Sequence, residues 1–470
     1  MLRVAVLAQD PIALARALAD RPGLAVLASR PQGAPRPDDA RWSFVACDPV
    51  EESNALVPPP GDGTALGYGG APPAPRWIGV VPYEALRSLE RGAWTRTPDE
   101  RPKSLFDRPV WRRYAAVVRM DHRTGEVVVE GDDAASTARL AGAIRQKFEQ
   151  AAANPETCRR RSALGDFVLR TLPPDETDDA HRTRVKEALR LIAAGDLYEV
   201  NLSRRIPLLF QGDPLALFES LLAAAPAPWG FLMDLGGSVV CGVSPELALS
   251  VRGDALRTCP IKGTRPRGSD ARTDAHHARS LASDAKEQAE LTMAVDVHRN
   301  DLGRVAVPGS VRLASDPRVV PGRTVWSRVA EIVARRLPGT SLAEIAQALL
   351  PCGSVTGAPK VRAMEAIARL EPWRRGAYTG AFGYVGRAGA LELAVAIRTL
   401  QIDESARGVA GSQPDRKGQP TERLASYFTG GGIVADSIPD LELEETRWKA
   451  IHIESLAGLR PHPVCNSRIP

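Results

Sequence analysis

Two pairs of glutamates recur at a spacing of three residues. Glu287 and Glu290 form one pair, and Glu442 and Glu445 form the other. In an α-helix, residues three apart share a face, so each pair would present two carboxylates together. Magnesium prefers carboxylate and water oxygens and often also binds substrate oxygens. Two facing pairs could therefore hold one magnesium ion and a substrate carboxylate, although on spacing alone solvated helix faces with lysine partners are the better interpretation.

A second candidate site joins Glu246, in Ser244-Pro245-Glu246, to Lys262, in the segment Pro260 to Thr264. Residues 247–260 are typical of a hairpin turning at Gly253-Asp254, which would bring the two side chains close. A carboxylate beside an amine forms an ion pair or, when buried, an acid/base group next to a nucleophile. Taken alone, the ion pair is the better interpretation. Only eight of the 61 basic residues are lysine, and lysine, unlike arginine, can lose its proton and attack.

Two glycine-rich segments, 353–360 and 430–437, could turn backbone amides toward an anion. We expect the second to be a loop leading into a helix that is capped by Ser437, where the helix dipole would add to the attraction. Taken singly, each segment could equally be a tight turn, and neither is a Walker A or dinucleotide motif. Arg398 lies near the end of an alternating strand, 391–400, where small neighbours on its face leave room for a carboxylate.

The elements that would position these residues indicate a mixed α and β fold with antiparallel pairs, without the strand and helix alternation of a parallel sheet. Helical spacing before Gly195 predicts a helix that ends there. Further predicted elements are strands over 76–83 and 114–130, helices over 134–152, 280–299 and 342–350, and a hairpin over 231–244. Residues 154–166 resemble a linker and residues 403–423 an exposed loop.

Composition limits the class of protein. The chain has 470 residues, 44% apolar and 25% charged, which is ordinary for a globular protein of two parts. A net charge of +5 with no basic block argues against nucleic acid as a partner. The six cysteines lack disulfide or metal spacing, which indicates reduced thiols and a cytoplasmic location. We expect neither a signal peptide nor a membrane-spanning segment.

The motifs, taken in order along the chain, resemble those of the chorismate-binding enzymes, a family that includes anthranilate, aminodeoxychorismate, isochorismate and salicylate synthases. The resemblance covers Thr177 to Leu456 strongly and the region before it more loosely. It rests on eight ordered segments: 192–203, 244–246, 260–267, 286–290, 299–305, 353–360, 397–399 and 431–437.

The resemblance implies an α+β, anthranilate-synthase-like fold, with antiparallel sheets packed orthogonally in a β-sandwich core flanked by helices. It implies an N-terminal anthranilate-synthase-like region with a linker over 1–165 and a chorismate-binding catalytic domain over 166–460. The N-terminal region of relatives holds a tryptophan-like ligand, and the sequence leaves open whether this chain binds one.

The resemblance also assigns roles to residues of this chain. Glu290 and Glu445 would coordinate magnesium, with Glu287 and Glu442 supporting them. Glu246 would act as general acid, and Lys262, made neutral by burial or by passing its proton to Glu246, would add to C2 of chorismate. The substrate itself would be bound by Thr264, Tyr378, Arg398 and the amides of Gly431 and Gly432.

Lys262 discriminates within the family, because anthranilate synthases carry alanine there, whereas the aminodeoxychorismate synthase subunit typically has Pro-Ile-Lys-Gly-Thr. The resemblance thus implies amination of chorismate at C4 to 4-amino-4-deoxychorismate, in 4-aminobenzoate and folate biosynthesis. With no Gly-x-Cys-x-Gly elbow in the chain, ammonia would come from a separate glutamine amidotransferase subunit. The alternatives are an anthranilate synthase, an isochorismate or salicylate type of synthase, and a non-catalytic regulatory homologue.

Four positions depart from the family pattern. Glu199 stands where glutamine is usual, Leu291-Thr292 replaces the usual Asn, and Cys352 takes a glycine position. Thr324 stands where many members place a histidine on the substrate side. The change to Thr324 affects the expected contact to the departing hydroxyl or the enolpyruvyl group of the substrate.

Overall fold

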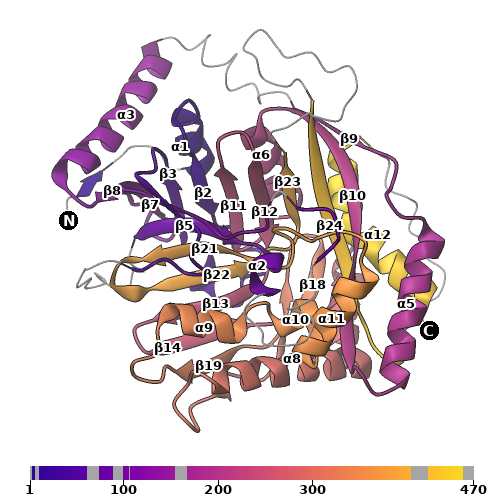
Figure 1. Cartoon of the computed structure of the whole chain (residues 1–470). Helices are drawn as coiled ribbons and strands as arrows, with labels where there is room; N and C mark the ends of the chain where they lie inside the picture. The colour runs from indigo at the N-terminus through magenta and orange to yellow at the C-terminus, as the bar shows by residue number, and fades with distance from the viewer. Residues whose placement is uncertain are drawn as a thin grey trace.

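Two large antiparallel sheets dominate the molecule in a computed structural model that describes residues 3–5, 10–60, 74–87, 99–104, 106–153, 167–403 and 422–458 (Figure 1). The larger sheet has twelve strands. In spatial order these are β1 (Arg3–Ala5), β8 (Val127–Gly131), β7 (Ala116–Asp121), β3 (Trp42–Ala46), β2 (Ala25–Ala28), β11 (Trp229–Asp234), β12 (Val239–Ser244), β23 (Thr399–Ile402), β24 (Arg423–Ile433), β10 (Glu199–Gly212) and β20 (Gly357–Ala358), with β9 (Phe167–Thr171) also pairing with β10.

The second sheet has nine strands, and a small third sheet has three. The nine are β16 (Arg312–Leu313), β19 (Ile332–Arg335), β14 (Ala255–Cys259), β13 (Leu247–Arg252), β22 (Leu391–Val395), β21 (Ala381–Gly386), β5 (Pro75–Val81), β6 (Val110–Arg113) and β4 (Glu51–Ser53). The three are β15 (Ile261–Pro266), β18 (Val325–Val329) and β17 (Arg318–Pro321).

The two large sheets pack face to face through a shared apolar cluster that draws on strands of both. Phe231 on β11 stacks on Phe382 of β21 with ring centroids 3.6 Å apart, and Phe44 on β3 meets Tyr384 of β21 at 5.4 Å. In Figure 1, β11 and β12 run across the direction of β21 and β22. The expected α+β class with packed antiparallel sheets is confirmed.

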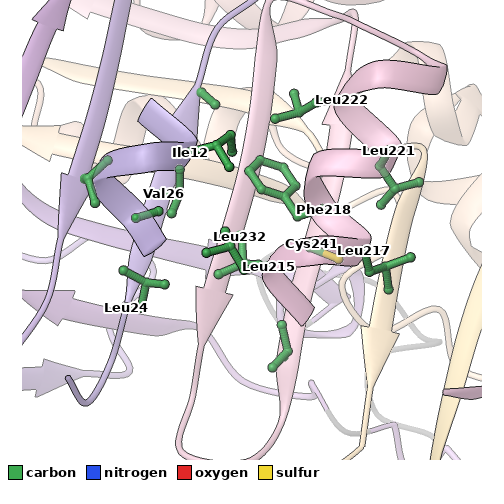
Figure 2. Close-up of a cluster of buried hydrophobic side chains, with 14 of the residues drawn as sticks. Ile12, Leu24, Val26, Leu215, Leu217, Phe218, Leu221, Leu222, Leu232 and Cys241 are labelled. Carbon is green, nitrogen blue, oxygen red and sulfur yellow. The ribbon is translucent and has the colours of Figure 1, made fainter. Parts of the chain in front are cut away.

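Helices cover the outer faces of both sheets. On the larger sheet, α1 (Pro11–Ala17) and α6 (Pro214–Ala224) bury leucines against β2, β11 and β12 (Figure 2), and α3 (Ala134–Ala153) and α12 (Pro439–Leu456) join the same cluster. Each fully buried leucine or phenylalanine contributes about 1.5–3 kcal/mol. On the nine-stranded sheet lie α8 (Ala285–Gly303) and α9 (Leu342–Leu349). The other helices of the described residues are α2 (Tyr83–Arg87), α5 (Asp178–Ala193), α7 (Ala271–Ser283), α10 (Gly353–Thr356) and α11 (Lys360–Leu370), with the short turns η1 (Pro37–Ala40) and η4 (Arg387–Gly389).

Several predicted elements are confirmed. The helix before Gly195 is α5, and Gly195 follows its cap at φ +80°, a conformation that suits a residue without a Cβ. Both predicted hairpins form, as β11 with β12 and β13 with β14. The predicted helices over 134–152 and 342–350 correspond to α3 and α9.

Three local predictions are wrong. The helix expected over 280–299 is two helices, because Asp284 interrupts the chain and its carboxylate accepts the backbone N–H of Glu287 at 3.1 Å, starting α8 anew. The strand expected over 391–400 breaks at Arg398, which has φ +51°, so that β22 and β23 belong to different sheets. The glycines at 430–432 lie inside strand β24, and Ile438, not Ser437, precedes α12 as its cap residue.

Strands from both sides of residue 165 share the two large sheets, since β2 pairs with β11 and β5 pairs with β21. The division into regions 1–165 and 166–460 stays a prediction. The expected linker, 154–166, and nearly all of the loop expected over 403–423 lie outside the described residues. Within the described ranges, no helix combines the length and apolar character needed to cross a bilayer. Four cysteines there are buried free thiols: Cys47, Cys241, Cys259 and Cys352.

Candidate active site

Lys262 lies on β15 with only 8% of its side chain exposed. Its Nζ forms a direct ion pair with Oε1 of Glu199, the first residue of β10, whose side chain is 3% exposed. Glu199 is held on its other side by β20, where Gly357 has φ +133° and an added Cβ would fall 2.2 Å from the Glu199 carbonyl oxygen. The backbone that carries the carboxylate is therefore fixed in place.

The environment of Lys262 favours its charged form. Burial by itself would lower the pKa of this amine, but the nearby carboxylates of Glu199, Glu290 and Glu246 raise it above its usual value. The lowered pKa expected for a nucleophilic lysine is therefore not a property of the site as it stands. An acceptor must take the proton before the amine can attack.

Glu246 is 3% exposed and lies between β12 and β13. The hydroxyl of Ser354 on α10 donates a hydrogen bond to its Oε1. Burial raises the pKa of Glu246 to about 7, although Ser354 and the charge of Lys262 oppose the rise. Lys262 is thus near Glu246, as the hairpin predicted, but its direct partner is Glu199. A carboxyl with a pKa about 7 is suited to donating a proton at neutral pH.

Gly263 shapes the strand beside Lys262. The pairing of β15 with β18 shifts register between Lys262 and Thr264, and Gly263 has φ +77° at this bulge. A Cβ on Gly263 would lie 2.6 Å from Oε2 of Glu287, so only glycine lets α8 approach so closely. The Oε1 atom of Glu287 accepts a hydrogen bond from Arg265 at 2.9 Å.

The two acidic pairs lie on different helices, α8 and α12, and Lys286 connects them. Burial would lower the pKa of Lys286, but Glu290, Glu442, Glu445 and Glu287 together raise it. The Lys286 ammonium thus lies in the field of all four carboxylates, 3.7 Å from Glu290. Lys286 with Glu290 and Lys449 with Glu445 are ion pairs of the kind that the spacing alone favoured, and a cation site between the two acidic pairs stays a prediction.

Individual environments differ among the four carboxylates. Burial, with the charge of Glu287, raises the pKa of Glu290 to about 7. Burial and Glu445 also raise the pKa of Glu442. Burial would raise the pKa of Glu445 too, but Lys449 at 2.6 Å and Lys286 lower it overall. The site therefore concentrates negative charge that a divalent cation would neutralise.

The fit of these residues to magnesium rests on Glu442. Its Oε1 accepts a hydrogen bond from Ser437 at 2.6 Å, whereas its Oε2 is buried without a hydrogen-bond partner among the described residues. An orphaned carboxylate oxygen facing other carboxylates suits a hard cation. In the same described part of the chain, no group of three or more acidic, histidine or cysteine side chains is arranged so that it could hold a metal ion. Magnesium usually keeps several waters, so one or two direct carboxylates suffice.

Two glycines of β24 connect Lys262 with α12. A Cβ on Gly432 would lie 2.5 Å from Oε1 of Glu199 and 3.2 Å from Nζ of Lys262. A Cβ on Gly431 would lie 3.3 Å from Glu442 and 3.4 Å from Glu445. Because successive strand residues face opposite sides, only glycine backbone separates these groups here. Beyond Tyr427, β24 no longer pairs with β23, and the carbonyl of Gly430 accepts a hydrogen bond from Lys449 at 2.7 Å.

Arg398 directly precedes β23. Its guanidinium is half-buried and makes no hydrogen bond or ion pair with any described residue. Burial lowers the pKa of Arg398, yet arginine keeps its charge at neutral pH. Tyr378 is buried, stacks on Phe428 at 5.2 Å, and points its hydroxyl toward Gly430. A guanidinium without a partner among the described residues can bind a carboxylate.

Two threonines lie at the surface. Thr264 is exposed on β15, and its place beside the substrate stays a prediction. Thr324 is exposed in the turn before β18, where its carbonyl accepts the N–H of Arg267 at 3.0 Å.

Sequence reasoning missed the parts played by Ser354 and Glu199, whereas it had offered Lys286 as a lysine partner of the acidic pairs. The signal for Glu199 was its departure from the family pattern, whereas Ser354 belonged to a segment that we expected to bind an anion through its backbone. That segment is instead the short helix α10, and Gly353 packs it against Val297 of α8.

A separate cavity lies between the two large sheets. Its polar lining includes Asp39, Arg252 and Glu392, and Glu392 accepts hydrogen bonds from Arg252 at 3.1 Å and from Trp229 at 3.2 Å. Trp42 from the N-terminal region also lines it.

Residues 37–455 match the family of chorismate binding enzymes, and the chain belongs to this family. It is an enzyme of the type that includes the anthranilate, aminodeoxychorismate and isochorismate synthases.

Relatives in this class carry different activities in their names. The chain is 35% identical to anthranilate synthase component 1 of Streptomyces coelicolor over 387 residues, which cover 79% of this chain and 71% of the relative. It is 39% identical to aminodeoxychorismate synthase component 1 of Salmonella typhimurium over 253 residues, 54% of this chain and 52% of the relative. The crystal structure of anthranilate synthase component I from Streptococcus pneumoniae superposes with a TM-score of 0.67 at 27% identity, covering 89% of this chain and 92% of that one.

Proposed function

We propose that this enzyme aminates chorismate at C4 to give 4-amino-4-deoxychorismate, the precursor of 4-aminobenzoate in folate biosynthesis. The observation that carries the proposal is the buried amine of Lys262, which lies near the protonatable carboxyl of Glu246. A lysine can form and break a covalent bond to carbon. An alanine at that position, typical of anthranilate synthases, offers no such nucleophile.

The substrate is a small dicarboxylate, and the site offers positive groups on one side of Lys262. Arg398 supplies an unpaired guanidinium, and Gly431 and Gly432 supply amides without side chains above them. Together with Tyr378 they would hold one carboxylate of chorismate. Thr264 would contact the substrate from β15.

Magnesium would be held by Glu290 and Glu445, with Glu287 and Glu442 supporting it, directly or through water. When bound there, it supplies positive charge for the ring carboxylate, which makes the ring less negative for attack. The orphaned Oε2 of Glu442 and the raised pKa of Glu290 support this assignment.

The reaction would proceed through two displacements. The neutral amine of Lys262 bonds to C2 as the C4–O bond breaks, and Glu246 gives its proton to the departing hydroxyl, which leaves as water. Ammonia then bonds to C4 while the bond between C2 and Lys262 breaks, and the surplus proton on the new amine returns to Glu246. Nitrogen thus ends para to the ring carboxylate.

A glutamine amidotransferase subunit would supply the ammonia. The relatives named above are component 1 proteins, and we propose that this chain likewise works with a second component in the cytoplasm.

Anthranilate synthesis is the second candidate, because the Streptomyces coelicolor relative of that name is matched over 71% of its length. It requires ammonia to enter at C2 with no covalent lysine intermediate. Isochorismate formation, with water entering at C2, is a third outcome that the same assay detects.

The test is to incubate the purified chain with chorismate, magnesium and ammonium and to identify the product by chromatography and mass spectrometry. We expect 4-amino-4-deoxychorismate, formed only with magnesium. Anthranilate or isochorismate as the main product would overturn the proposal, and no consumption of chorismate would indicate a non-catalytic homologue.

A further inference from the structure

Glu199 has a position that the mechanism above leaves without a role. Among the described residues, its carboxylate is the only acidic group within 4.0 Å of the Lys262 Nζ. Both side chains are at least nine-tenths buried, so bulk water has little access to the pair. The side-chain amide of Asn201 donates to the same Oε1 of Glu199 at 3.4 Å and to the Ser354 carbonyl at 3.1 Å, which helps to hold that oxygen in place.

Other charged or titratable groups face Lys262 from the surrounding elements. Glu246 faces it from the start of β13, Glu290 and His298 from α8, and Glu445 from α12. None of these makes an ion pair with Nζ in the part of the chain that the structure describes. Glu199 alone has the direct contact through which a proton can pass in one step.

We propose that Glu199 is the proton acceptor that frees the Lys262 amine for attack. This inference rests on the proposed amination at C4, because it concerns the amine that begins that reaction. Glutamine, the usual residue of the family at this position, has an amide oxygen that accepts a hydrogen bond but does not keep a proton at neutral pH.

The geometry separates the tasks of the two buried carboxyl groups. Glu246 is bonded to Ser354, and its pKa of about 7 lets it hold the proton that the leaving hydroxyl needs. As the general acid, Glu246 must already carry a proton when the reaction begins. It therefore cannot also accept the proton of Lys262. Two carboxyls in different surroundings thus serve as acid and base.

The proton balance closes over one turnover. The ammonium of Lys262 transfers one proton to Oε1 of Glu199, which leaves a neutral amine and a neutral carboxyl. Substrate bound beside the pair would exclude the remaining water, which favours this uncharged pair over the ion pair. After ammonia displaces Lys262 from C2, the released amine takes the proton back from Glu199, and no outside base is consumed.

The test compares Glu199→Gln with the unaltered enzyme from pH 6.5 to 8.5, at saturating magnesium and a fixed concentration of free ammonia. We expect kcat at pH 7 to fall at least tenfold, with the chorismate KM changed less than threefold. The ratio of variant to unaltered kcat should rise up to tenfold per pH unit, because the variant depends on Lys262 losing its proton to solvent. Glu199→Asp, which keeps a carboxylate, should show a pH-independent ratio.

Glu187→Gln removes a carboxylate from an exposed pair with Arg190 on α5 and serves as the matched control, with no change expected. A Glu199→Gln variant with unaltered kcat, or one reduced equally at every pH, would overturn the inference. If Glu199→Gln does not fold, the test is the ratio of the Glu199→Asp kcat to the unaltered kcat. A ratio that varies with pH would count against the proposal. The product made by the unaltered enzyme separately tests the proposed function, so the two failures are distinguishable.

Discussion

The ammonium of Lys262 pairs with the carboxylate of Glu199, a residue 63 positions earlier in the chain. The pair is buried between β15 and β10, and Gly432 of β24 lies against it without a side chain. Glu246, which the hairpin brings near, is instead bonded to Ser354. Lys262 is therefore charged in the resting site. Before its amine can attack, a neighbouring buried carboxylate must accept its proton.

The buried pair predicts a stability effect. Lys262→Met would leave the Glu199 carboxylate buried without its partner, and breaking such a pair costs about 3–5 kcal/mol. We expect a clearly lower melting temperature for this variant. Adding Glu199→Gln removes the stranded charge, so the double variant should recover most of the loss. Thermal unfolding followed by circular dichroism measures both, and a double variant as unstable as the single one would refute the effect.

If Glu246 is the general acid, its replacement should lower kcat, and its deprotonation should make kcat/KM fall at basic pH. Glu246→Gln should lower kcat by about 100-fold or more, because it removes the proton donor. With a pKa of about 7 in the free protein, Glu246 loses its proton as pH rises, so kcat/KM should fall above neutral pH. Ser354→Ala removes a hydrogen bond that lowers this pKa, so the basic limb should move to higher pH. A limb unmoved in Ser354→Ala would disconnect Glu246 from the pH dependence.

If the four glutamates bind magnesium, replacing a glutamate and replacing the neighbouring Lys286 should change the magnesium affinity in opposite directions. Glu290→Gln should weaken binding at least about tenfold. Lys286→Met should strengthen it several-fold, because it removes a cation that competes for the same carboxylates, worth about 1 kcal/mol. Isothermal titration of magnesium into the substrate-free protein measures both. Equal affinities in all three proteins would show that magnesium binds elsewhere.

The strand glycines predict a contrast between neighbours. Gly432→Ala places a methyl group 2.5 Å from Glu199 Oε1 and should push the carboxylate from Lys262, lowering kcat at least about tenfold. Gly431→Ala meets its nearest atoms at 3.3 Å and should be milder. Both variants keep the backbone amide. Steady-state kinetics of the two variants under the same conditions measures the contrast. A lower kcat for Gly431→Ala than for Gly432→Ala would contradict it.

The sequence predicted the fold class and most elements because hydrophobic periodicity and turn residues act locally. It offered a meeting of Glu287, Glu290, Glu442 and Glu445 as one of two interpretations of their spacing, and in the structure the charges of all four act on Lys286. It could not predict the partner of Lys262, since that contact depends on how β10, β15 and β24 pack. The order of the motifs placed Glu199 in the segment 192–203 but gave no indication that it contacts Lys262.

The local errors have physical causes. Glycine is a poor strand residue, so Gly430 to Gly432 favoured a loop, but pairing with β10 keeps them extended. Arg398 adopts φ +51°, which is uncommon for residues other than glycine and carries no sequence signal. Asp284 suits a helix cap as well as a helix surface, and tertiary packing decides between them.

The most direct measurement is the product formed from chorismate, magnesium and ammonium by the unaltered enzyme and by Lys262→Ala under identical conditions. We expect the unaltered enzyme to make 4-amino-4-deoxychorismate and Lys262→Ala to make it at least about 100-fold more slowly, because the covalent step is lost. Anthranilate or isochorismate from the unaltered enzyme, or 4-amino-4-deoxychorismate from Lys262→Ala at an undiminished rate, would contradict a C4 amination that proceeds through Lys262.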